Sequence, residues 1–390
     1  MLKIKTNENF ASLSGSYLFT ETQRRIRLFE AENPEKKVIK LGIGDVTRPL
    51  APTVVEAMLR AAEEMGRADG FHGYAPEAGY GFLRTAIAEN YASRGVDVRP
   101  EEVYVSDGSK SDASGIFDLF GDLPVVIPDP VYPVYADSCV MSGKKVVYLP
   151  ATRENGFLPT PDLAPDRASA IFICSPNNPT GAAYGTAGLA EWVAYAKRTG
   201  SLIVCDAAYS AFISSDCPNS IYRIPGAKSC AVELNSLSKS AGFTGTRCAW
   251  AVFPRELGEL AGMWLRRQSA KFNGVAYVVQ RAAEAALSKQ GMRESEENIA
   301  YYRRNAQKIC SVLSEKGIYH TGGIDSPYIW LKCPGTDDSW GFFDRMLHRL
   351  RIAGTPGAGF GKNGEGYFRL TAFCSDEDAD EAAERMRKLL

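Results

Sequence analysis

The segment Leu202-Ile-Val-Cys-Asp206-Ala-Ala-Tyr209 contains four consecutive apolar residues that end on a carboxylate. A continuous apolar run of this length is typical of a strand buried on both faces, as in a parallel sheet. A charged carboxylate is costly to bury alone, so we expect Asp206 to meet a cation. The simpler interpretation is a helix N-cap, which is a frequent use of aspartate after a strand.

Similar short apolar runs occur on both sides of this segment, and helix-compatible stretches separate them. The predicted strands are Val103–Ser106, Val125–Pro128, Lys145–Leu149, Ala170–Cys174, Leu202–Cys205, Ala231–Leu234 and Ala249–Phe253. This alternation predicts an α/β fold with a mainly parallel, seven-stranded sheet flanked by helices. Ligands bind beyond the carboxyl ends of the strands in such sheets, so functional side chains should directly follow these runs.

The pattern changes after about residue 274. The predicted elements there are a helix over Glu294–Lys316, a strand over Tyr328–Lys332, a helix over Asp344–Leu350, a strand over Phe368–Ala372 and a helix over Glu377–Leu389. They indicate a second, smaller α/β domain. The first ~45 residues are too few to fold alone and should pack against it. We therefore predict a large domain over 46–274 and a small domain made of 1–45 and 275–390.

Composition excludes several functional classes. The 45 basic and 46 acidic side chains nearly cancel, so no strong field attracts nucleic acid. No run of about 18 apolar residues predicts a membrane span, and the N-terminus lacks the features of a signal peptide or an organelle presequence. Nine cysteines without a Cys-x-x-Cys pair favour a reducing compartment, with the cytoplasm as the expected location. The three histidines show no metal-ligand spacing, so no metal site is predicted.

The segment Ser236-Leu-Ser-Lys-Ser-Ala-Gly-Phe-Thr-Gly-Thr-Arg247 follows the sixth predicted strand. A lysine in this place can be partly desolvated, which lowers its pKa and frees its amine for imine formation. The hydroxyls of Ser236, Ser238 and Thr246, with Arg247, would suit a dianionic phosphate. The competing interpretation of Lys239 is a solvated lysine on a loop.

Three more strand ends carry candidate ligand-binding residues. Cys174-Ser-Pro-Asn-Asn-Pro-Thr-Gly181 forms a rigid turn that can aim the amide of Asn178. Ser106-Asp-Gly-Ser-Lys-Ser-Asp112 opens a helix, where backbone N–H groups and Ser109 can bind phosphate. Tyr132 can stack on an aromatic ring. Cys174 and Cys205 are expected to be core residues.

Taken together and in this order, Asn178, Asp206, Tyr209, Lys239 and Arg247 resemble the cofactor set of the fold-type I aminotransferases that depend on pyridoxal 5'-phosphate (PLP). The resemblance implies catalytic roles for Lys239, Asp206 and Tyr209. Lys239 would hold PLP as an imine and move a proton, Asp206 would pair with the ring nitrogen, and Tyr209 would reach the ring's phenolic oxygen. The implied cofactor-binding residues are Ser109, Lys110, Tyr132, Asn178, Asp206, Tyr209, Ser236, Ser238, Lys239, Arg247 and, from the neighbouring subunit, Tyr74.

Further segments resemble the LL-diaminopimelate aminotransferase branch of this family. They are Phe71-His-Gly-Tyr-Ala-Pro-Glu-Ala-Gly, Lys271-Phe-Asn-Gly and the glycine-rich stretch from Gly354 to Phe373. The branch implies a homodimer with shared active sites. It also implies transamination between LL-2,6-diaminopimelate and 2-oxoglutarate on the route from tetrahydrodipicolinate to lysine. The implied substrate-binding residues are Tyr17, Gly44, Glu77, Lys110, Tyr132, Asn178, Asn273 and Arg369, with Glu77 and Asn273 crossing the interface and Arg369 gripping the α-carboxylate.

Two alternatives remain open at this point. A broad aromatic or aspartate-type aminotransferase, or a PLP-dependent lyase, would share the cofactor residues and lack the pocket for the distal end of diaminopimelate. A PLP-binding regulator would need an attached DNA-binding domain, and the first ~45 residues show no such pattern. Asn235 and Leu237 depart from the Arg and Phe that the branch leads us to expect. These departures bear only on substrate selectivity.

Overall fold

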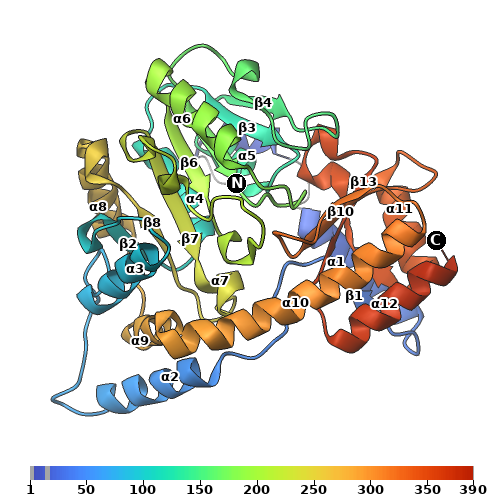
Figure 1. Ribbon diagram of the computed structural model, residues 1–390, viewed down its shortest axis with the longest axis horizontal. Helices are drawn as coiled ribbons and strands as arrows, with labels where there is room; N and C mark the ends of the chain where they lie inside the picture. Colours follow the sequence, from blue (N-terminus) through green and yellow to red (C-terminus); the bar gives the residue numbers. More distant parts are fainter. Residues whose placement is uncertain (1–3, 14–17, 390) are drawn as a thin grey trace.

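The computed structural model describes residues 4–13 and 18–389. Figure 1 shows two lobes, and the larger one is built around a seven-stranded sheet in the order β2-β8-β7-β6-β5-β3-β4. Strand β8 runs antiparallel to both of its neighbours, and the other pairs are parallel. The strands are β2 (Val103–Ser106), β3 (Val125–Asp129), β4 (Val146–Pro150), β5 (Ala170–Cys174), β6 (Leu202–Asp206), β7 (Ala231–Ser236) and β8 (Ala249–Val252). All seven predicted strands are confirmed to within two residues at each end.

The apolar runs form strands because helices cover both faces of the sheet. On β5, Phe172 packs with Tyr135 and Trp264 on one face. Ile171 and Ile173 pack on the other face, with Trp192. The helices of this lobe are α2 (Pro52–Met65), α3 (Gly81–Ser93), α4 (Ser109–Gly115), α5 (Val134–Met141), α6 (Thr186–Thr199), α7 (Leu237–Ser240), α8 (Glu259–Lys271) and α9 (Tyr277–Leu287).

The smaller lobe contains a four-stranded antiparallel sheet in the order β12-β13-β10-β9. Its elements are β9 (His320–Gly322), β10 (Tyr328–Lys332), α11 (Ser339–Arg345), β11 (Ile352–Ala353), β12 (Thr355–Pro356), β13 (Tyr367–Thr371) and α12 (Asp376–Leu389). The long helix α10 (Lys289–Glu315) runs from the end of α9 into this lobe (Figure 1).

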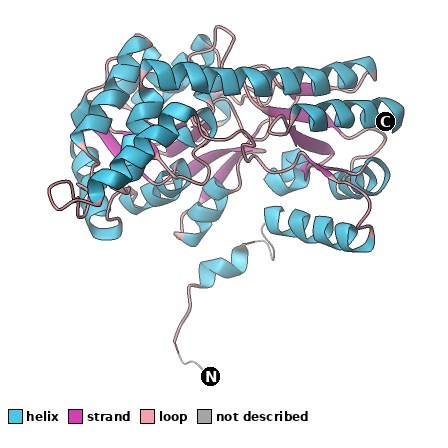
Figure 2. Cartoon of the chain, turned by 90° about the horizontal axis from the view of Figure 1, so that it is seen from below, coloured by secondary structure: helices cyan, strands magenta, loops and turns pink. Residues whose placement is uncertain are grey.

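The N-terminal part of the chain joins the smaller lobe through β-pairing. Helix α1 (Leu18–Glu32) precedes strand β1 (Ile39–Lys40), which pairs in parallel with β11. Phe29 and Leu41 belong to the apolar core of that lobe. This packing fits the predicted place of residues 1–45 in the small domain. The predicted boundary at 274/275 differs from the structure, because α9 packs against α2 and α3 and belongs to the larger lobe. Figure 2 shows residues 4–13 ahead of α1, and they lie against α5, where the Asn7 Nδ2 donates to the Met141 carbonyl at 3.0 Å.

Two predicted helices begin in the wrong place because their polar caps lie outside the apolar pattern. The helix predicted over Asp344–Leu350 ends where predicted but starts earlier: α11 begins at Ser339, where the Asp338 carboxylate caps it by accepting a hydrogen bond from the Gly341 N–H at 2.9 Å. A π-helical turn then covers Met346–Leu350. Helix α10 similarly starts five residues before Glu294, where Ser288 accepts from the Gly291 N–H at 3.1 Å.

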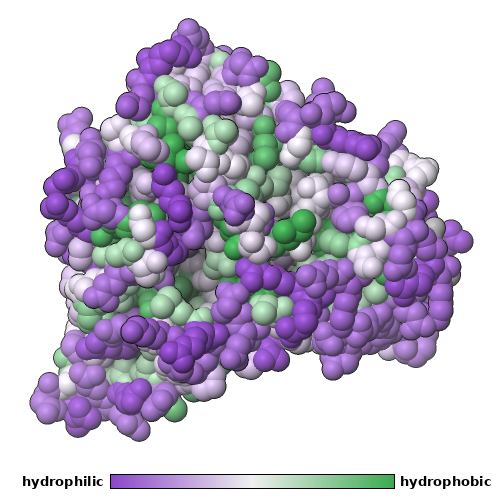
Figure 3. All heavy atoms as spheres, viewed as in Figure 1, coloured by the Kyte–Doolittle hydropathy of each residue, from purple (hydrophilic) through white to green (hydrophobic). Residues whose placement is uncertain are grey.

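The surface of the described residues is mostly hydrophilic over α10 and the smaller lobe, and apolar side chains gather between the lobes (Figure 3). Within 4–13 and 18–389, no helix is long and apolar enough to span a bilayer.

Strand β6 should contribute strongly to stability. Ile203 is fully buried against the α6 side of the sheet, so truncation to alanine leaves a cavity. We expect Ile203→Ala to lower the free energy of unfolding by about 2–5 kcal/mol in chemical denaturation. The control Leu163→Ala removes a half-exposed side chain and should change it by about 0.5 kcal/mol or less. Equal effects of the two variants would contradict this placement of β6.

Candidate active site

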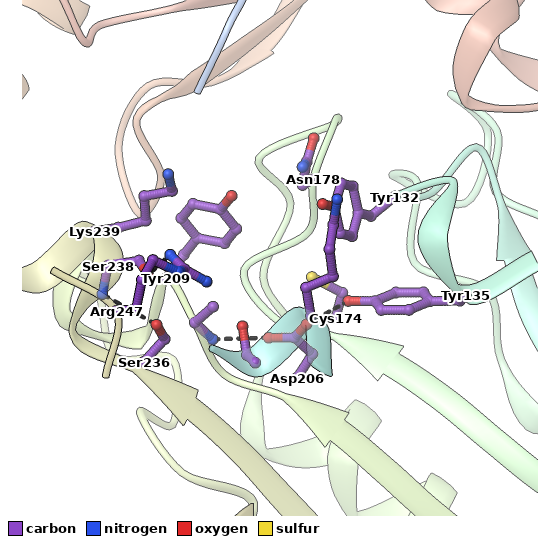
Figure 4. A pocket seen from close by; sticks show the side chains of 13 residues that line it. Tyr132, Tyr135, Cys174, Asn178, Asp206, Tyr209, Ser236, Ser238, Lys239 and Arg247 are labelled. Atoms are coloured by element: carbon purple, nitrogen blue, oxygen red, sulfur yellow. Dashed lines mark hydrogen bonds between the residues drawn. The ribbon is translucent and has the colours of Figure 1, made fainter. Parts of the chain in front are cut away.

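A cavity of about 260 Å³ lies beyond the carboxyl ends of the parallel strands. Its walls come from the segments that follow β2, β3, β5, β6 and β7, which is where the sheet topology places ligand sites. The lining residues are Ser109, Lys110, Tyr132, Tyr135, Cys174, Asn178, Asp206, Ala208, Tyr209, Ser236, Ser238, Lys239 and Arg247 (Figure 4). Residues up to 138 positions apart in the sequence, from Ser109 to Arg247, therefore share one space.

Lys239 is positioned by a short helix that starts as soon as β7 ends. Ser236 caps α7, its hydroxyl accepting from the Ser238 N–H at 3.0 Å. The Lys239 Nζ donates to the backbone carbonyl of Gly44. The pKa of the Lys239 ammonium is lowered to about 8, above all by burial; Asp45 opposes this shift, and Arg247 and Arg369 add to it. The amine is therefore available as a neutral base or nucleophile near physiological pH.

Asp206 ends β6 and is 6% exposed. Its carboxylate accepts hydrogen bonds from the Tyr135 hydroxyl at 2.6 Å and the Ala208 N–H at 3.0 Å. Burial raises the pKa of this carboxyl group, although the two hydrogen bonds act to lower it. Among the described residues no lysine or arginine forms an ion pair with Asp206, so the carboxylate can still bind a cation within the cavity.

Hydroxyls and a guanidinium form an anion cradle at one side of the cavity. The Arg247 Nη1 donates to the Ser238 Oγ at 3.1 Å, and Ser109 and Ser236 line the same wall. A Cβ at Gly108 would lie 2.1 Å from the Arg247 Nη2. Only glycine at that position lets the guanidinium reach the cradle. Three hydroxyls and one arginine match the acceptor oxygens and charge of a phosphate group.

Arg369 lies beside the cavity, with 1% of its surface exposed. Its Nη1 donates to the Asn178 Oδ1 at 2.6 Å, and its Nη2 donates to the Gly42 carbonyl. Figure 4 shows the amide nitrogen of Asn178 directed toward the cavity. The Tyr209 and Tyr328 hydroxyls are 2.7 Å apart. One arginine thus orients the amide that the sequence singled out.

Some predicted site residues do not line the cavity of their own chain. Gly44 reaches the site through its carbonyl, and Tyr17 lies outside the described residues. Tyr74 is 88% exposed, and Glu77 and Asn273 are also exposed. None of these three lines the cavity of its own chain. Their predicted roles therefore require a second copy of the chain.

The sequence did not single out Tyr135, Ala208 or Tyr328. Tyr135 follows Tyr132 by three residues, in the first turn of the helix after β3, and this spacing was the available signal. Tyr328 comes from β10, and nothing in its local sequence points toward β6. Cys174 packs in the core as predicted and in addition lines the cavity.

An open α/β sheet that presents a desolvated lysine, a buried carboxylate and an anion cradle in one cavity is typical of an enzyme active site. The chain matches the family described as aminotransferase class I and II over residues 36–386, and it belongs to that family.

Relatives with close sequence similarity align with nearly the whole chain. An LL-diaminopimelate aminotransferase of Agathobacter rectalis is 48% identical, over 98% of this chain and 99% of its own. An LL-diaminopimelate aminotransferase of Lachnospira eligens is 47% identical, over 99% of this chain and 100% of its own. The solved structure of L,L-diaminopimelate aminotransferase from Chlamydomonas reinhardtii is 40% identical with a TM-score of 0.94, and 99% of each chain is covered.

The lowered pKa of Lys239 can be tested directly on the protein freed of bound carbonyl compounds. A small aldehyde followed by borohydride reduction labels neutral amines, and mass spectrometry reports the labelled position. Because the neutral fraction rises as the pH climbs through the pKa, labelling of Lys239 should reach half its maximum near pH 8. The exposed Lys37 serves as the control: hydrogen bonds to Asp378 and Glu381 raise its pKa, so its labelling should need a higher pH than that of Lys239. The same pH dependence of labelling at both lysines would contradict a lowered pKa of Lys239.

Proposed function

We propose that this chain is a PLP-dependent aminotransferase that moves an amino group between LL-2,6-diaminopimelate and 2-oxoglutarate, with glutamate as the second amino acid. On this proposal its keto-side product is tetrahydrodipicolinate, a precursor of lysine. The observation that carries the proposal is the convergence of Lys239 and Asp206 on one cavity. The full-length similarity to LL-diaminopimelate aminotransferases supports the choice of substrate. The free thiols of all nine cysteines fit a reducing compartment such as the cytoplasm.

The donor set of the cavity fits PLP. The buried Asp206 carboxylate matches a protonated ring nitrogen, and Asn178 and Tyr209 match the phenolic oxygen. Tyr132 would cover a ring face. The phosphate would be held by Ser109, Ser236, Ser238 and Arg247. When bound, PLP supplies an electron sink for the bond pair left on the substrate's α-carbon.

The chain's own residues then move and hold protons and charge. The Lys239 Nζ accepts the proton that leaves the substrate's α-carbon and later donates it back, and a pKa of about 8 suits both directions near neutral pH. Arg369 binds the α-carboxylate through paired N–H donors, held in place by Asn178 and the Gly42 carbonyl. Because Arg369 is buried among the rings of Tyr328 and Phe360, water competes little for that contact.

Recognition of the distal end of the substrate would involve two subunits of a homodimer. Diaminopimelate carries an ammonium and a carboxylate at its far end, so its pocket needs an anion together with a cation or amide donors. Lys110 lines the cavity. The exposed Glu77 and Asn273 would enter the cavity of the neighbouring subunit, and Tyr74 would reach the cofactor phosphate there.

Glu77 should set the preference for the amino donor. We expect Glu77→Ala to lower kcat/KM for diaminopimelate by about tenfold or more, because the distal ammonium loses a charged partner. The kcat/KM for glutamate should stay within about twofold of the wild-type value. Mixing the yellow holoenzyme with each donor and following the loss of the cofactor absorbance band measures this for one half-reaction. The control Glu63→Ala removes an exposed carboxylate on α2. An unchanged preference in Glu77→Ala would favour a broad aromatic or aspartate-type aminotransferase.

Shared active sites predict complementation between two inactive variants. Lys239→Ala lacks the catalytic amine, and Tyr74→Ala lacks the phosphate contact given to the neighbour. In mixed dimers one of the two sites receives Lys239 from one chain and Tyr74 from the other, so about a quarter of all sites should be restored after unfolding and co-refolding. Turnover of the mixture measures this. Activity no higher than the sum of the separate variants would contradict sharing.

A further inference from the structure

A second cavity, of about 290 Å³, lies on the opposite side of the lysine-bearing segment. It is bounded by α3, the end of α9, the first half of α10 and the segment from β7 into α7. Figure 1 shows α7 lying against α10, and the surface is hollowed above α10 on this face (Figure 3). The exposed Ser93, Ala211 and Glu296 form its rim. The cavity is therefore open to solvent and shares no lining residue with the candidate active site.

The two cavities share a wall one segment thick. Along residues 235–241, Ser236, Ser238 and Lys239 line the first cavity, and Asn235, Leu237, Ser240 and Ala241 line the second. The same division occurs after β6. Ala208 and Tyr209 face the first cavity, and Ser210 and Ala211 face the second. The Asn235 Nδ2 donates to the Ser210 Oγ at 3.4 Å, which joins the two halves of this wall.

Polar groups in the second cavity lack partners within the chain. Ser295, near the start of α10, is 8% exposed, and its hydroxyl has no hydrogen-bond partner among the described residues. The buried Asn219 Oδ1, which can only accept hydrogen bonds, also has no partner among the described residues. Buried polar atoms are normally satisfied, so these two indicate a bound molecule.

The charges and the floor of the cavity define the kind of molecule. Arg94 is half-buried on its wall, where its Nε donates to the Asn90 carbonyl at 3.2 Å and its guanidinium lies 4.6 Å from the centre of the Tyr91 ring. It interacts electrostatically with the buried Glu233, but among the described residues no carboxylate lies within ion-pair distance of it. Glu296 is instead neutralised by Arg303 at 2.7 Å. The available charge is therefore positive and calls for an anion. Leu237, Trp250 and Ile299 are buried and provide an apolar floor.

We propose that this cavity is a second ligand site, for a small α-hydroxy or α-amino monocarboxylate with an aliphatic side chain. Its carboxylate binds Arg94, its hydroxyl or ammonium donates to the Asn219 Oδ1, and the Ser295 hydroxyl bonds to a remaining polar atom of the ligand. The aliphatic chain packs on the floor. Because an occupant touches the reverse side of the segment that carries Lys239, binding alters turnover without entering the active site. The site itself does not rest on the proposed substrate.

The probe is L-2-hydroxy-4-methylpentanoate, which has the required groups and no amine to transfer. Calorimetric titration of the holoenzyme is carried out in saturating 2-oxoglutarate, which occupies the active site. We expect one binding event per chain, weakened about tenfold or more by Arg94→Gln. Ser295→Leu fills the cavity and should abolish the binding with no loss of thermal stability, because it also removes an unsatisfied hydroxyl.

Two controls isolate the recognition. Arg60→Gln removes an exposed arginine on α2 that pairs with Glu56 and should bind the probe like the wild type. The analogue 4-methylpentanoate, which lacks the donor for Asn219, should bind about tenfold more weakly. Absence of binding, which would mean that the cavity holds only water, overturns the proposal. So does binding that 2-oxoglutarate abolishes, or binding that survives in both Arg94→Gln and Ser295→Leu.

Discussion

Desolvation at the carboxyl ends of a buried sheet is the constraint on which the rest of this structure depends. Strand β6 ends on the buried Asp206, and the short helix α7 after β7 carries the half-buried Lys239 into the same cavity. The change from 10.5 to about 8 in the pKa of Lys239 corresponds to roughly 3 kcal/mol against its charged form. Burial also disfavours the charged form of Asp206. Burial makes the charged form of each group unfavourable in the free protein. A ligand that supplies an opposite charge or a hydrogen-bond partner therefore interacts strongly with it.

Neutral partners keep these groups in place at a lower cost than ion pairs would. Asp206 is oriented by a tyrosine hydroxyl and a backbone N–H, and Lys239 by a backbone carbonyl. A strong ion pair within the chain would fix the charge and leave nothing for a ligand to satisfy. The class I and II aminotransferase site is thus built from hydrogen bonds that orient the two charged groups and leave their charges for cofactor and substrate.

Coupling between distant parts of the chain passes through the same short segment. Residues 235–241 separate two cavities, and α10 continues from the second cavity into the smaller lobe, where Tyr302 and Ile309 pack in its core. Arg369, from β13, reaches back to Asn178 after β5. Arg369, the segment that carries Lys239 and the lobe-bridging helix α10 are therefore connected through packed elements.

The sequence by itself determined the seven strands, their mainly parallel arrangement and the chemical types at their ends, because buried runs and strand-end ligands follow from local patterning. It also placed Lys239, Asp206 and Asn178 in one site, since their spacing follows consecutive β-α units. Only the tertiary structure decided that Tyr135 supports Asp206, that Tyr328 meets Tyr209, and that Arg369 holds Asn178. These pairs lie 71, 119 and 191 residues apart, and no local pattern records which distant side chain will satisfy a buried polar group. That choice is made by packing.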